Sequence, residues 1–424
     1  MFKGLNPTSK KAVIATLIIS LVLLFGSMTP PLLGYIFRSY PPPEYNPMLL
    51  LQIPAFVGMI VSFVIGPLAL KVNLKILTVI ATVAALIYFL IFLFVGSTNF
   101  TMLLVAACFM GITQGAAFVL TGSIFGAYVL DPLQRANFVA ISGAILNGGA
   151  AVVNIIGGIV AAQNEGLNWN NAYWLGLLIV PALILFWIMM PWAPEADEAP
   201  AGGPEGHGGP GGPGGPPPPS GGIPPKVWMI IGMGLIAFLG MAVFLLNVGT
   251  YITEELGQAW GYGYTTTESG LANSIFTIFG VVAGFSFPIV VKFLKNWIAA
   301  IGYALAGVGL FFIMTFQDNI FLIYAGAGLC GYGFNVAMPF VMGQLMAITP
   351  PRLIPVVMSL NMGFMNLGMT FAPNIFGALG GMIDGFIATQ LFIAIFFVAA
   401  AVVIAVLLFV VMKPKAPEGP PAEH

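Results

Sequence analysis

The side chains that could do chemistry within the apolar parts of this sequence are neutral. Gln114, Asn147, Tyr332, Asn335 and Asn366 each lie inside a long apolar run. Carboxamide and phenol groups can donate and accept hydrogen bonds. In an apolar medium they can hold an uncharged polar solute, or they can bond one helix to another. The residues alone leave both interpretations open.

Groups suited to catalysis or to metal binding are scarce. The histidines are His207, in a Gly- and Pro-rich stretch, and His424, while Cys108 and Cys330 lie inside apolar runs. Buried cysteines of this kind behave as small core side chains. These residues cannot supply a nucleophile with its base or a cluster of metal ligands. We therefore predict that the protein is not an enzyme and binds no metal or other cofactor.

Composition places these side chains in a membrane. Of 424 residues, 59% are hydrophobic and 6% are charged, whereas soluble domains carry about a quarter charged residues. A run of about 20 uncharged apolar residues spans a bilayer core as a helix, and this sequence contains twelve such runs. Runs of this length lack the short alternating segments of a membrane barrel, which predicts an all-α integral membrane protein. The runs lie near residues 12–37, 47–70, 76–96, 101–128, 136–162, 172–192, 227–252, 269–291, 297–316, 320–346, 354–382 and 386–412.

The distribution of basic residues predicts the orientation. Of the 13 Lys and Arg residues, all but Arg38 fall on the side that holds both chain ends. Translocated loops are depleted in positive charge, so both termini are expected in the cytoplasm. A net charge of −1 gives no reason to expect a nucleic-acid partner. The other basic residues are Lys3, Lys10, Lys11, Lys71, Lys75, Arg135, Lys226, Lys292, Lys295, Arg352, Lys413 and Lys415.

A stretch that cannot form a packed core divides the twelve runs into two groups of six. Residues 201–225 read AGGPEGHGGPGGPGGPPPPSGGIPP. Such a composition buries too little apolar surface to offset the entropy of ordering. We expect a six-helix half at residues 1–192, a flexible cytoplasmic linker at 193–226 and a second six-helix half at 227–424.

The two halves repeat each other weakly. Several short matches recur at a nearly constant offset, each in the same relative span, which indicates two bundles derived from one ancestral unit. The matches are PLALK from Pro67 with PIVVK from Pro288 at a shift of 221, Arg135 and Ser142 with Arg352 and Ser359 at 217, and NIIG from Asn154 with NIFG from Asn374 at 220.

With this organisation the whole chain resembles the major facilitator superfamily. That family carries a motif of the form Gly-x-x-x-Asp-Arg-x-Gly-Arg-Lys between its second and third helices, and GPLALKVNLK, residues 66–75, stands at this place. Gly66, Lys71 and Lys75 match the motif. The departures are Leu70 for the acid that helps to lock the family's cytoplasmic gate, Asn73 for the glycine and Leu74 for the second Arg.

The resemblance implies alternating access, in which two bundles rock around a site near the bilayer midplane. In this family the first, fourth, seventh and tenth helices line the cavity. Polar residues on these spans are therefore the expected substrate contacts. An asparagine pair on the fifth and eleventh helices is expected to join them. The expected substrate-binding residues are Gln114, Thr121, Tyr332, Asn335, Asn147, Asn366, Asn247 and Arg38, and the expected gating residues are Gly66, Lys71, Lys75, Arg135, Lys292 and Arg352.

The positions of the charged residues limit the mechanism. No apolar run carries a charged residue or histidine in its interior, which predicts that no buried proton relay crosses the membrane. Arg38, Glu254, Glu255 and Glu268 flank the outer ends of the first, seventh and eighth runs. Arg38 is either a solvated loop charge or a group that guides a carboxylate to the external mouth.

The expected function is secondary or facilitated transport of a small organic solute. Efflux of amphipathic compounds and exchange of an organic monoanion through Arg38 remain alternatives. A channel or receptor fits poorly with two duplicated bundles joined by a flexible link. The expected partners are the solute and the lipid bilayer, and the expected form is a monomer in the inner membrane of a bacterium.

Overall fold

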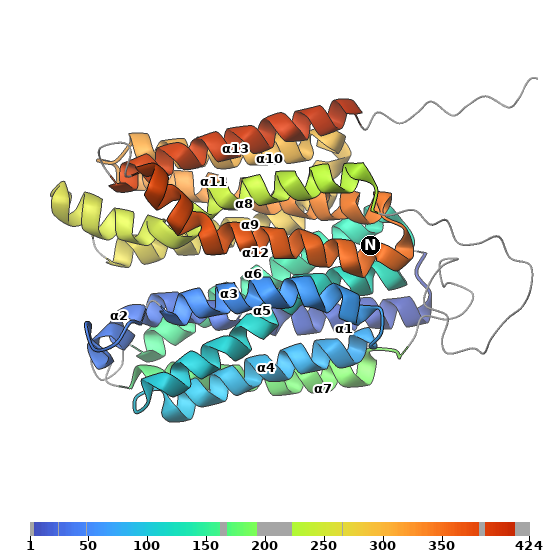
Figure 1. Cartoon of the computed structure of the whole chain (residues 1–424), viewed down its shortest axis with the longest axis horizontal. Coiled ribbons are helices and arrows are strands. Elements are labelled where there is room, and N and C mark those ends of the chain that lie inside the picture. The colour runs from blue at the N-terminus through green and yellow to red at the C-terminus, as the bar shows by residue number, and fades with distance from the viewer. Residues whose placement is uncertain are drawn as a thin grey trace, which may run out of the picture.

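The computed structural model describes residues 4–23, 25–47, 49–161, 168–192, 223–264, 266–380 and 386–411. Within these ranges the chain is helical apart from short connections and contains no strand. The long helices run side by side and form two stacked groups, one from each half of the chain (Figure 1).

The first half forms one six-helix bundle. A short 3-10 turn breaks its first crossing into α1 and α2, and its last crossing begins with a 3-10 segment. Its elements are α1 (Pro7–Leu23), η1 (Phe25–Met28), α2 (Thr29–Ser39), α3 (Leu49–Ala69), α4 (Leu74–Val95), α5 (Phe100–Tyr128), α6 (Pro132–Ala161), η3 (Trp169–Leu178) and α7 (Ile179–Met189).

The second half repeats this arrangement. Its first helix begins at Pro225, a residue type favoured at a helix start because its missing N–H would have no partner there. Its elements are α8 (Pro225–Thr250), η5 (Tyr251–Ala259), α9 (Thr266–Leu294), η6 (Lys295–Trp297), α10 (Ile298–Thr315), α11 (Ile320–Ile348), η7 (Pro351–Leu353), α12 (Ile354–Gly380) and α13 (Phe386–Val411).

Most of the predicted spans correspond to single long helices. Among the described residues, nine helices are long and apolar enough to cross a membrane. The difference from twelve has three causes. The first crossing is divided between α1 and α2, the eighth and ninth form one apolar stretch across the tight turn η6, and the apolar part of the last is the shorter segment Leu391–Leu407.

Local signals at the helix starts agree with the internal repeat. Asn99 caps α5 by accepting a hydrogen bond from the N–H of Met102, and Asn319 caps α11 by accepting one from Phe321. Such a cap stabilises a helix by about 1 kcal/mol. Both helices are 29 residues long and each is the fourth crossing of its half, so the caps fix equivalent helices in the two bundles.

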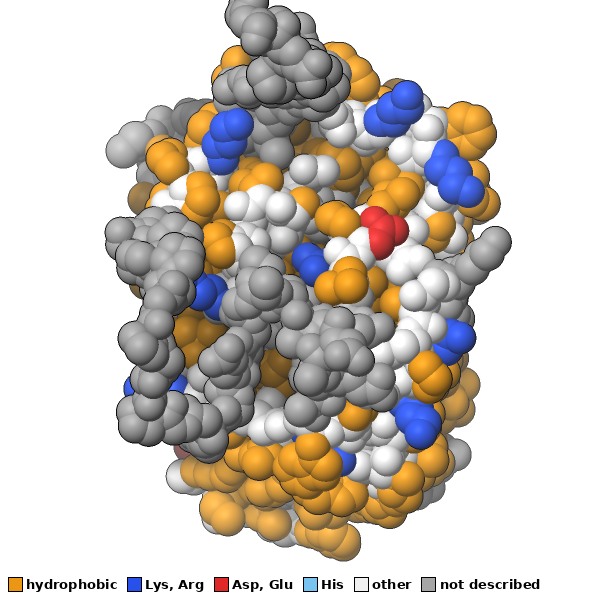
Figure 2. All heavy atoms as spheres, turned by 90° about the vertical axis from the view of Figure 1, so that its right-hand side faces the viewer, with side chains coloured by type: hydrophobic (Ala, Val, Ile, Leu, Met, Phe, Trp, Pro, Cys, Tyr) orange, Lys and Arg blue, Asp and Glu red, His pale blue; other side chains and the backbone are white. Residues whose placement is uncertain are grey.

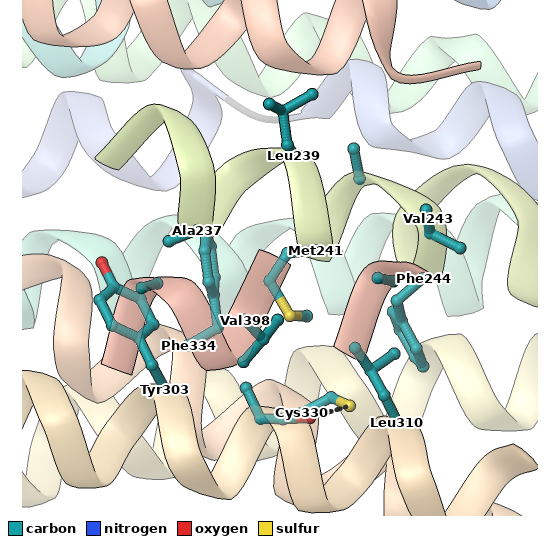
Figure 3. Packing of buried hydrophobic residues seen from close by; sticks show 14 of the residues in the cluster. Ala237, Leu239, Met241, Val243, Phe244, Tyr303, Leu310, Cys330, Phe334 and Val398 are labelled. Carbon is teal, nitrogen blue, oxygen red and sulfur yellow. Dashed lines mark hydrogen bonds between the residues drawn. The ribbon is translucent and has the colours of Figure 1, made fainter. Parts of the chain in front are cut away.

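Each bundle has its own core. In the first bundle, the hydroxyls of Thr29 and Tyr88 are hydrogen bonded, and the Thr29 hydroxyl lies 3.1 Å from the hydroxyl of Tyr173. In the second, α8 packs on α10, α11 and α13 through buried apolar side chains, among them Phe244, which shows no detectable exposure (Figure 3). Close packing of this kind holds helices together where lipid gives no hydrophobic incentive to associate.

The two bundles meet along two seams. α3 runs beside α12 on one side, and α6 runs beside α9 and α11 on the other. The second crossing of each half thus pairs with the fifth crossing of the other half, which is the pattern expected for two related bundles. Residues 193–222 lie outside the described residues, so the predicted linker stays a prediction.

One face of the molecule is basic. Figure 2 shows Lys and Arg side chains scattered over the face that lies at the right in Figure 1, where the N-terminal end is marked. We call it the basic face, and the opposite one the Arg38 face. That the basic face is cytoplasmic stays a prediction. The described basic residues at helix ends on this face are Lys10, Lys11, Lys71, Lys75, Arg135, Lys226, Lys292, Lys295 and Arg352.

Candidate functional site

A hydrogen bond between two asparagines joins the bundles at the middle of the helices. Asn147 of α6 donates from Nδ2 to Oδ1 of Asn335 of α11, over 3.0 Å. Asn335 in turn donates to the carbonyl of Gly331 over 2.8 Å. Gly280 of α9 faces this pair so closely that a Cβ there would lie 2.8 Å from Nδ2 of Asn335. A glycine at this position lets α9 close over the two carboxamides.

The opposite seam holds an equivalent polar contact. Asn366 of α12 donates to the hydroxyl of Ser62 on α3 over 2.9 Å, and Ser62 donates to the carbonyl of Gly115 on α5 over 3.0 Å. Asn147 and Asn366 lie on the fifth crossings of their respective halves. Each seam therefore has a polar centre in which an asparagine of one bundle meets the other bundle.

Towards the basic face the α3–α12 seam becomes tighter. The N–H of Gly66 donates to Oγ of Ser359 over 3.1 Å, and Ser359 donates to the carbonyl of Ser62. A Cβ on Gly66 would lie 2.2 Å from Cβ of Ser359 and 2.4 Å from the carbonyl oxygen of Pro355. Since real Cβ atoms do not approach this closely, only glycine permits the contact.

The α6–α9 seam is closed in the same way. A Cβ on Gly284 of α9 would lie 2.6 Å from the carbonyl oxygen of Ala140 and 2.6 Å from Cβ of Ala144. Small residues at both surfaces allow the backbones to approach, as is usual where membrane helices must pack closely. The basic-face halves of the two bundles are therefore in contact along both seams.

A group of methionines fills the space between the seams on the basic side of the midplane. Met358 has no detectable exposure and Met346 is 1% exposed. They pack with Phe125 and Phe138 of the first bundle. Methionine is unbranched and adapts to irregular spaces, so this group can repack when neighbouring helices move. We call it the methionine cluster, and its members are Met338, Met342, Met346, Met358, Met362 and Met365.

Gln114 is a half-buried carboxamide without a hydrogen-bond partner among the described residues. Its neighbours on α5 point to two different helices. A Cβ on Gly111 would lie 2.9 Å from a carbonyl oxygen of α3, while Met110 packs against Gly26 of η1. Helical spacing puts Gln114 between these two directions, on the side of α5 that lies between η1 and α3.

The structure gives other predicted substrate residues different surroundings. Thr121, one of α5's buried residues, donates to the carbonyl of Ala117 over 2.9 Å. The Tyr332 hydroxyl lies 3.1 Å from that of Ser286 on α9. Both groups are thus engaged with their own or a neighbouring helix of the same bundle.

The remaining predicted substrate residues lie towards the Arg38 face. Asn247 is partly buried near the outer end of α8. Arg38 is exposed in the last turn of α2, with its guanidinium carbon 5.8 Å from the ring centre of Tyr35. The structure thus brings Asn147 and Asn335 together and leaves Arg38 at the rim.

Among the predicted gating residues, Gly66 lies directly in a seam and Lys75 lies within its own bundle. Lys75 is 3% exposed, and its ammonium group donates to the carbonyl of Met190 over 2.7 Å and lies 4.6 Å from the ring centres of both Trp187 and Trp192. This arrangement ties the start of α4 to the end of α7 through a hydrogen bond and cation–π contacts.

The other predicted gating residues lie at or near helix ends on the basic face. Arg135 is 6% exposed and its Nε donates to the carbonyl of Val129 within the same bundle. Lys71, Lys292 and Arg352 are exposed.

Sequence reasoning missed three residues that the seams depend on. Ser62, Gly280 and Gly284 have no motif or repeat match that singles them out. Ser359 had a signal, because it recurs as the repeat mate of Ser142. The structure uses the two serines differently, since Ser142 pairs with Ser20 of α1 over 2.7 Å whereas Ser359 bridges the bundles.

The midplane contains no formal charge in the described part of the chain. In the described helices, every Asp, Glu, Lys or Arg of the membrane-crossing segments lies near a helix end. The polar groups near the middle include the carboxamides and hydroxyls of Gln114, Asn147, Asn335, Asn366 and Ser62. This arrangement can form hydrogen bonds but offers no fixed counter-ion to a charged ligand.

Known proteins share this architecture. The human organic anion transporter MFSD10 (TETRAN) superposes with a TM-score of 0.73 at 12% identity, over 94% of this chain and 100% of that one. The proton:xylose symporter XylE, bound to 6-bromo-6-deoxy-D-glucose, gives 0.70 at 12% identity, over 96% of each chain. A bacterial homologue of the iron transporter ferroportin, in its outward-facing state, gives 0.66 at 13% identity, over 96% of this chain and 100% of that one. At such identities the likeness shows the fold alone.

The sequence itself also matches a family. None of the curated proteins compared with this chain matches it. A family model described as Major Facilitator Superfamily matches residues 15–259 and again residues 230–424. The predicted fold of twelve membrane helices in two pseudo-symmetric bundles is confirmed, and the chain belongs to the major facilitator superfamily, a family of membrane transporters.

Proposed function

We propose that this protein carries a small organic solute without a strong formal charge across the membrane by alternating access. The observation that supports this most directly is the midplane, where the described residues supply carboxamides and hydroxyls and no ionised side chain. A site for a dianion or a dication would need a fixed counter-charge, because an unpaired charge in this medium is costly. A neutral polar solute needs only hydrogen bonds.

Gln114 is the residue on which recognition depends in this proposal. Its carboxamide is half-buried and unpartnered among the described residues. A polar group left without a bond in an apolar medium is unfavourable, so a solute that satisfies it gains affinity. Asn147 and Asn335 are already bonded to each other, so a solute reaches them only when the α6–α11 seam opens.

The arrangement of the seams supports a cycle between two end states. The structure is closed on the basic face by Gly66, Gly284 and the methionine cluster. Transport to that face requires these contacts to separate while the opposite halves approach. Glycine and methionine suit such a change, since they present small or adaptable surfaces.

A panel of labelled solutes tests the substrate class. Purified protein in proteoliposomes would be offered hexoses, pentoses, nucleosides and monocarboxylates, each with and without an imposed pH gradient. We expect uptake of an uncharged class, reduced about 2- to 10-fold by Gln114→Ala with no loss of folded protein. Uptake confined to monocarboxylates and abolished by Arg38→Gln would contradict the proposal and favour monoanion exchange.

The methionine cluster supports a second candidate, the export of amphipathic compounds. It presents six adaptable thioether side chains next to Phe118, which is partly buried against the cluster. A broad apolar surface of this kind accepts several molecular shapes. Energised vesicles can be tested for the extrusion of lipophilic dyes. Extrusion that is lost when Met342 and Met358 are both changed to Ser would support export over uptake of a polar solute.

The cellular setting belongs to the same proposal. We place the protein in an inner membrane as a monomer. We place both ends in the cytoplasm because all the described Lys and Arg residues except Arg38 lie on the basic face. Protease protection of an epitope added after residue 424 in sealed right-side-out vesicles tests the orientation.

A further inference from the structure

The outer half of α9 carries two polar side chains on one face. Asn273 is exposed and Thr277 is half-buried, and both lie inside the apolar stretch that begins at Glu268. They are four residues apart, so they lie one above the other on the same side of the helix. The opposite side of α9 is exposed and apolar, as expected of a surface that meets lipid. The residues of this opposite side are Leu271, Ile278, Val282, Phe285 and Ile289.

The polar face of α9 is directed towards the first bundle. Gly280 follows Asn273 by seven residues, and a Cβ on it would lie 3.3 Å from Nδ2 of Asn147 on α6. Gly284 follows Thr277 by seven residues and packs on the backbone of α6. Seven residues are about two helical turns, so each polar residue shares the direction of one of these glycines. Asn273 and Thr277 therefore face α6 and not the lipid.

α6 and α9 are in contact towards the basic face and apart towards the Arg38 face. A Cβ on Gly284 would lie 2.6 Å from Cβ of Ala144. Further along α6, a Cβ on Gly148 would lie 3.9 Å from the nearest atom of α9, and one on Gly158 would meet no atom of the described chain within 4 Å. Gly158 follows Asn147 by eleven residues, about three turns, so it faces the same way. The two helices thus diverge, and we call the space between their outer halves the α6–α9 cleft.

The α6 side of this cleft is small and polar. Asn154 follows Asn147 by seven residues, lies on the same face of the helix and is half-buried. Ala151, between them, is also half-buried and has only a methyl group. A solute in the cleft would therefore meet a carboxamide on α6 and two polar groups on α9.

The two polar groups of α9 can each accept a further hydrogen bond. Asn273 donates from Nδ2 to the carbonyl of Ser269 over 3.3 Å, and the Thr277 hydroxyl donates to the carbonyl of Asn273 over 3.0 Å. Both bonds are made to the helix's own backbone. They use the donors and leave the oxygen of the carboxamide and that of the hydroxyl as acceptors.

We propose that Asn273 and Thr277 form an outer row of solute contacts in the α6–α9 cleft, and that the solute is an elongated, uncharged molecule with several hydroxyl groups, such as a linear polyol. The inference rests on the proposed function and names its substrate class. The two residues are separated by about 6 Å along the helix axis, and Asn273 lies about 10 Å from the level of Gly280 and the Asn147–Asn335 bond. Successive hydroxyl groups of one chain can donate to this row while the far end of the molecule reaches the midplane.

The chemistry of the row disfavours other solutes. An anion would meet two acceptor oxygens, and the one basic residue of α9, Lys292, lies in its last turn at the basic face. A lipophilic compound would separate the polar groups from water without replacing their hydrogen bonds, which is unfavourable. A hydroxyl-rich solute satisfies both oxygens and brings no charge to the midplane.

Binding of linear polyols to the purified protein tests the row. Titration calorimetry would compare sorbitol and xylitol with glycerol, which is too short to span the two residues. We expect the affinity of the unmodified chain to rise with polyol length. Asn273→Ala and Thr277→Val should each raise the Kd for sorbitol about 2- to 10-fold, as expected for the loss of one hydrogen bond, and leave the Kd for glycerol unchanged.

Ser274→Ala is the matched control. It removes a hydroxyl from the same helix, and this hydroxyl donates to the carbonyl of Gly270 over 2.8 Å. Successive residues are about 100° apart around a helix, so Ser274 lies beside the row and not in it. The Kd for sorbitol should be unchanged in this variant. Equal losses of affinity in Ser274→Ala and in Asn273→Ala would overturn the row.

Cysteine labelling gives a second measurement that reads the cleft directly. In a chain carrying Cys108→Ser, Asn273→Cys places a thiol in the cleft, and Thr98→Cys places one in the exposed α4–α5 connection on the same face. Saturating sorbitol should slow the reaction of a charged maleimide with Asn273→Cys several-fold and leave the reaction with Thr98→Cys unchanged. Equal rates with and without sorbitol in Asn273→Cys would overturn the proposal.

The outcomes separate this inference from the proposed function. Uptake of another uncharged class that depends on Gln114, but not on Asn273 or Thr277, would overturn the outer row and leave the proposed function standing. Uptake confined to monocarboxylates would overturn both. Sorbitol binding that is weakened by Asn273→Ala and Thr277→Val, and protection of Asn273→Cys by sorbitol, would support both.

Discussion

Gly66 and Ser359 are 293 residues apart in the chain and are joined by a 3.1 Å hydrogen bond from the glycine N–H to the serine hydroxyl. The two residues belong to different bundles, so this bond closes one seam on the basic face. Gly66 is also the first position of the family-like loop motif. Its role here follows from the missing side chain, because no other residue lets α3 approach α12 this closely.

A methyl group on Gly66 should open the basic face. Gly66→Ala places a Cβ 2.2 Å from Ser359 Cβ, and overpacking of this kind costs about 1–3 kcal/mol. That cost shifts the balance between closed and open states by about 5- to 150-fold. Spin labels can be attached at Lys71→Cys and Lys292→Cys, which are both exposed and lie on opposite bundles, in a chain whose exposed Cys108 has been changed to Ser. In this background the distance between the two labels should be longer in Gly66→Ala than in the parent.

Gly143→Ala is the control for that experiment. Its added Cβ would meet nothing within 4 Å, and alanine in a helix interior is favoured over glycine by about 0.5–1 kcal/mol. The label distance should stay unchanged in this variant. Equal distances in Gly66→Ala and Gly143→Ala would show that Gly66 does not hold the face closed.

The bond between Asn147 and Asn335 should appear as a modest coupling energy. Each single change to Ala removes the same cross-bundle hydrogen bond, so a double-mutant cycle isolates it. We expect a coupling near 0.6 kcal/mol, the average found for polar bonds between membrane helices. Unfolding in mixed detergent micelles provides the free energies, and additivity of the two single changes would mean that the bond contributes nothing.

Gln114→Ala should leave stability unchanged and weaken substrate binding. The Gln114 amide has no described partner whose bond could be lost, so the unfolding free energy should change by less than about 0.5 kcal/mol. Loss of one hydrogen bond to the solute costs about 0.5–1.5 kcal/mol of binding. Once a solute is known, calorimetric affinity and unfolding of the same variant give both numbers. A variant that loses both equally would assign Gln114 to packing.

Lys75→Met should destabilise the first bundle. The change removes the hydrogen bond to the Met190 carbonyl and the cation–π contacts with Trp187 and Trp192. A hydrogen bond to a charged group is worth about 1.5–3 kcal/mol, and the unfolding free energy should fall by that amount. Lys71→Met, at an exposed position of the same loop, should stay within about 0.5 kcal/mol of the parent. Similar losses of unfolding free energy in Lys75→Met and Lys71→Met would mean that the buried contacts of Lys75 do not stabilise the bundle.

Oxidation of Met358 should depend on opening of the basic face. This thioether has no detectable exposure, whereas Met102 is 41% exposed. Brief hydrogen peroxide treatment followed by mass spectrometry should convert Met102 first, since sulfoxide formation follows access to the sulfur. In Gly66→Ala, Met358 should oxidise several times faster. Equal protection of Met358 in both proteins would mean that the cluster stays closed when the seam is disturbed.

Much of the fold could be read from the sequence because the bilayer imposes strict conditions. Apolar length fixes where helices cross, and the placement of Asn99 and Asn319 just before two equivalent runs marks where two of them begin. The exceptions are local. The chain breaks its first crossing between α1 and α2, and it joins α9 to α10 through a turn too short to interrupt the apolar pattern.

The candidate site was predicted less completely. Residue type identified Asn147, Asn335 and Asn366, but it did not reveal that all three bond across the bundles rather than facing an open space. These helices are apolar on nearly every side, so periodicity gives little information about which face meets which neighbour. The same limit applies to Tyr332, whose hydroxyl turns to Ser286.

The sequence by itself determined the membrane helices, their duplication and the absence of charge from their interiors, since these depend on composition and on separations of a few residues. Only the tertiary structure decided that Ser62 meets Asn366 and that Gly66 closes a seam. Those facts depend on how far each helix is rotated and how closely backbones approach. Both are set by packing between segments up to about 300 residues apart, where no local rule of helix spacing reaches.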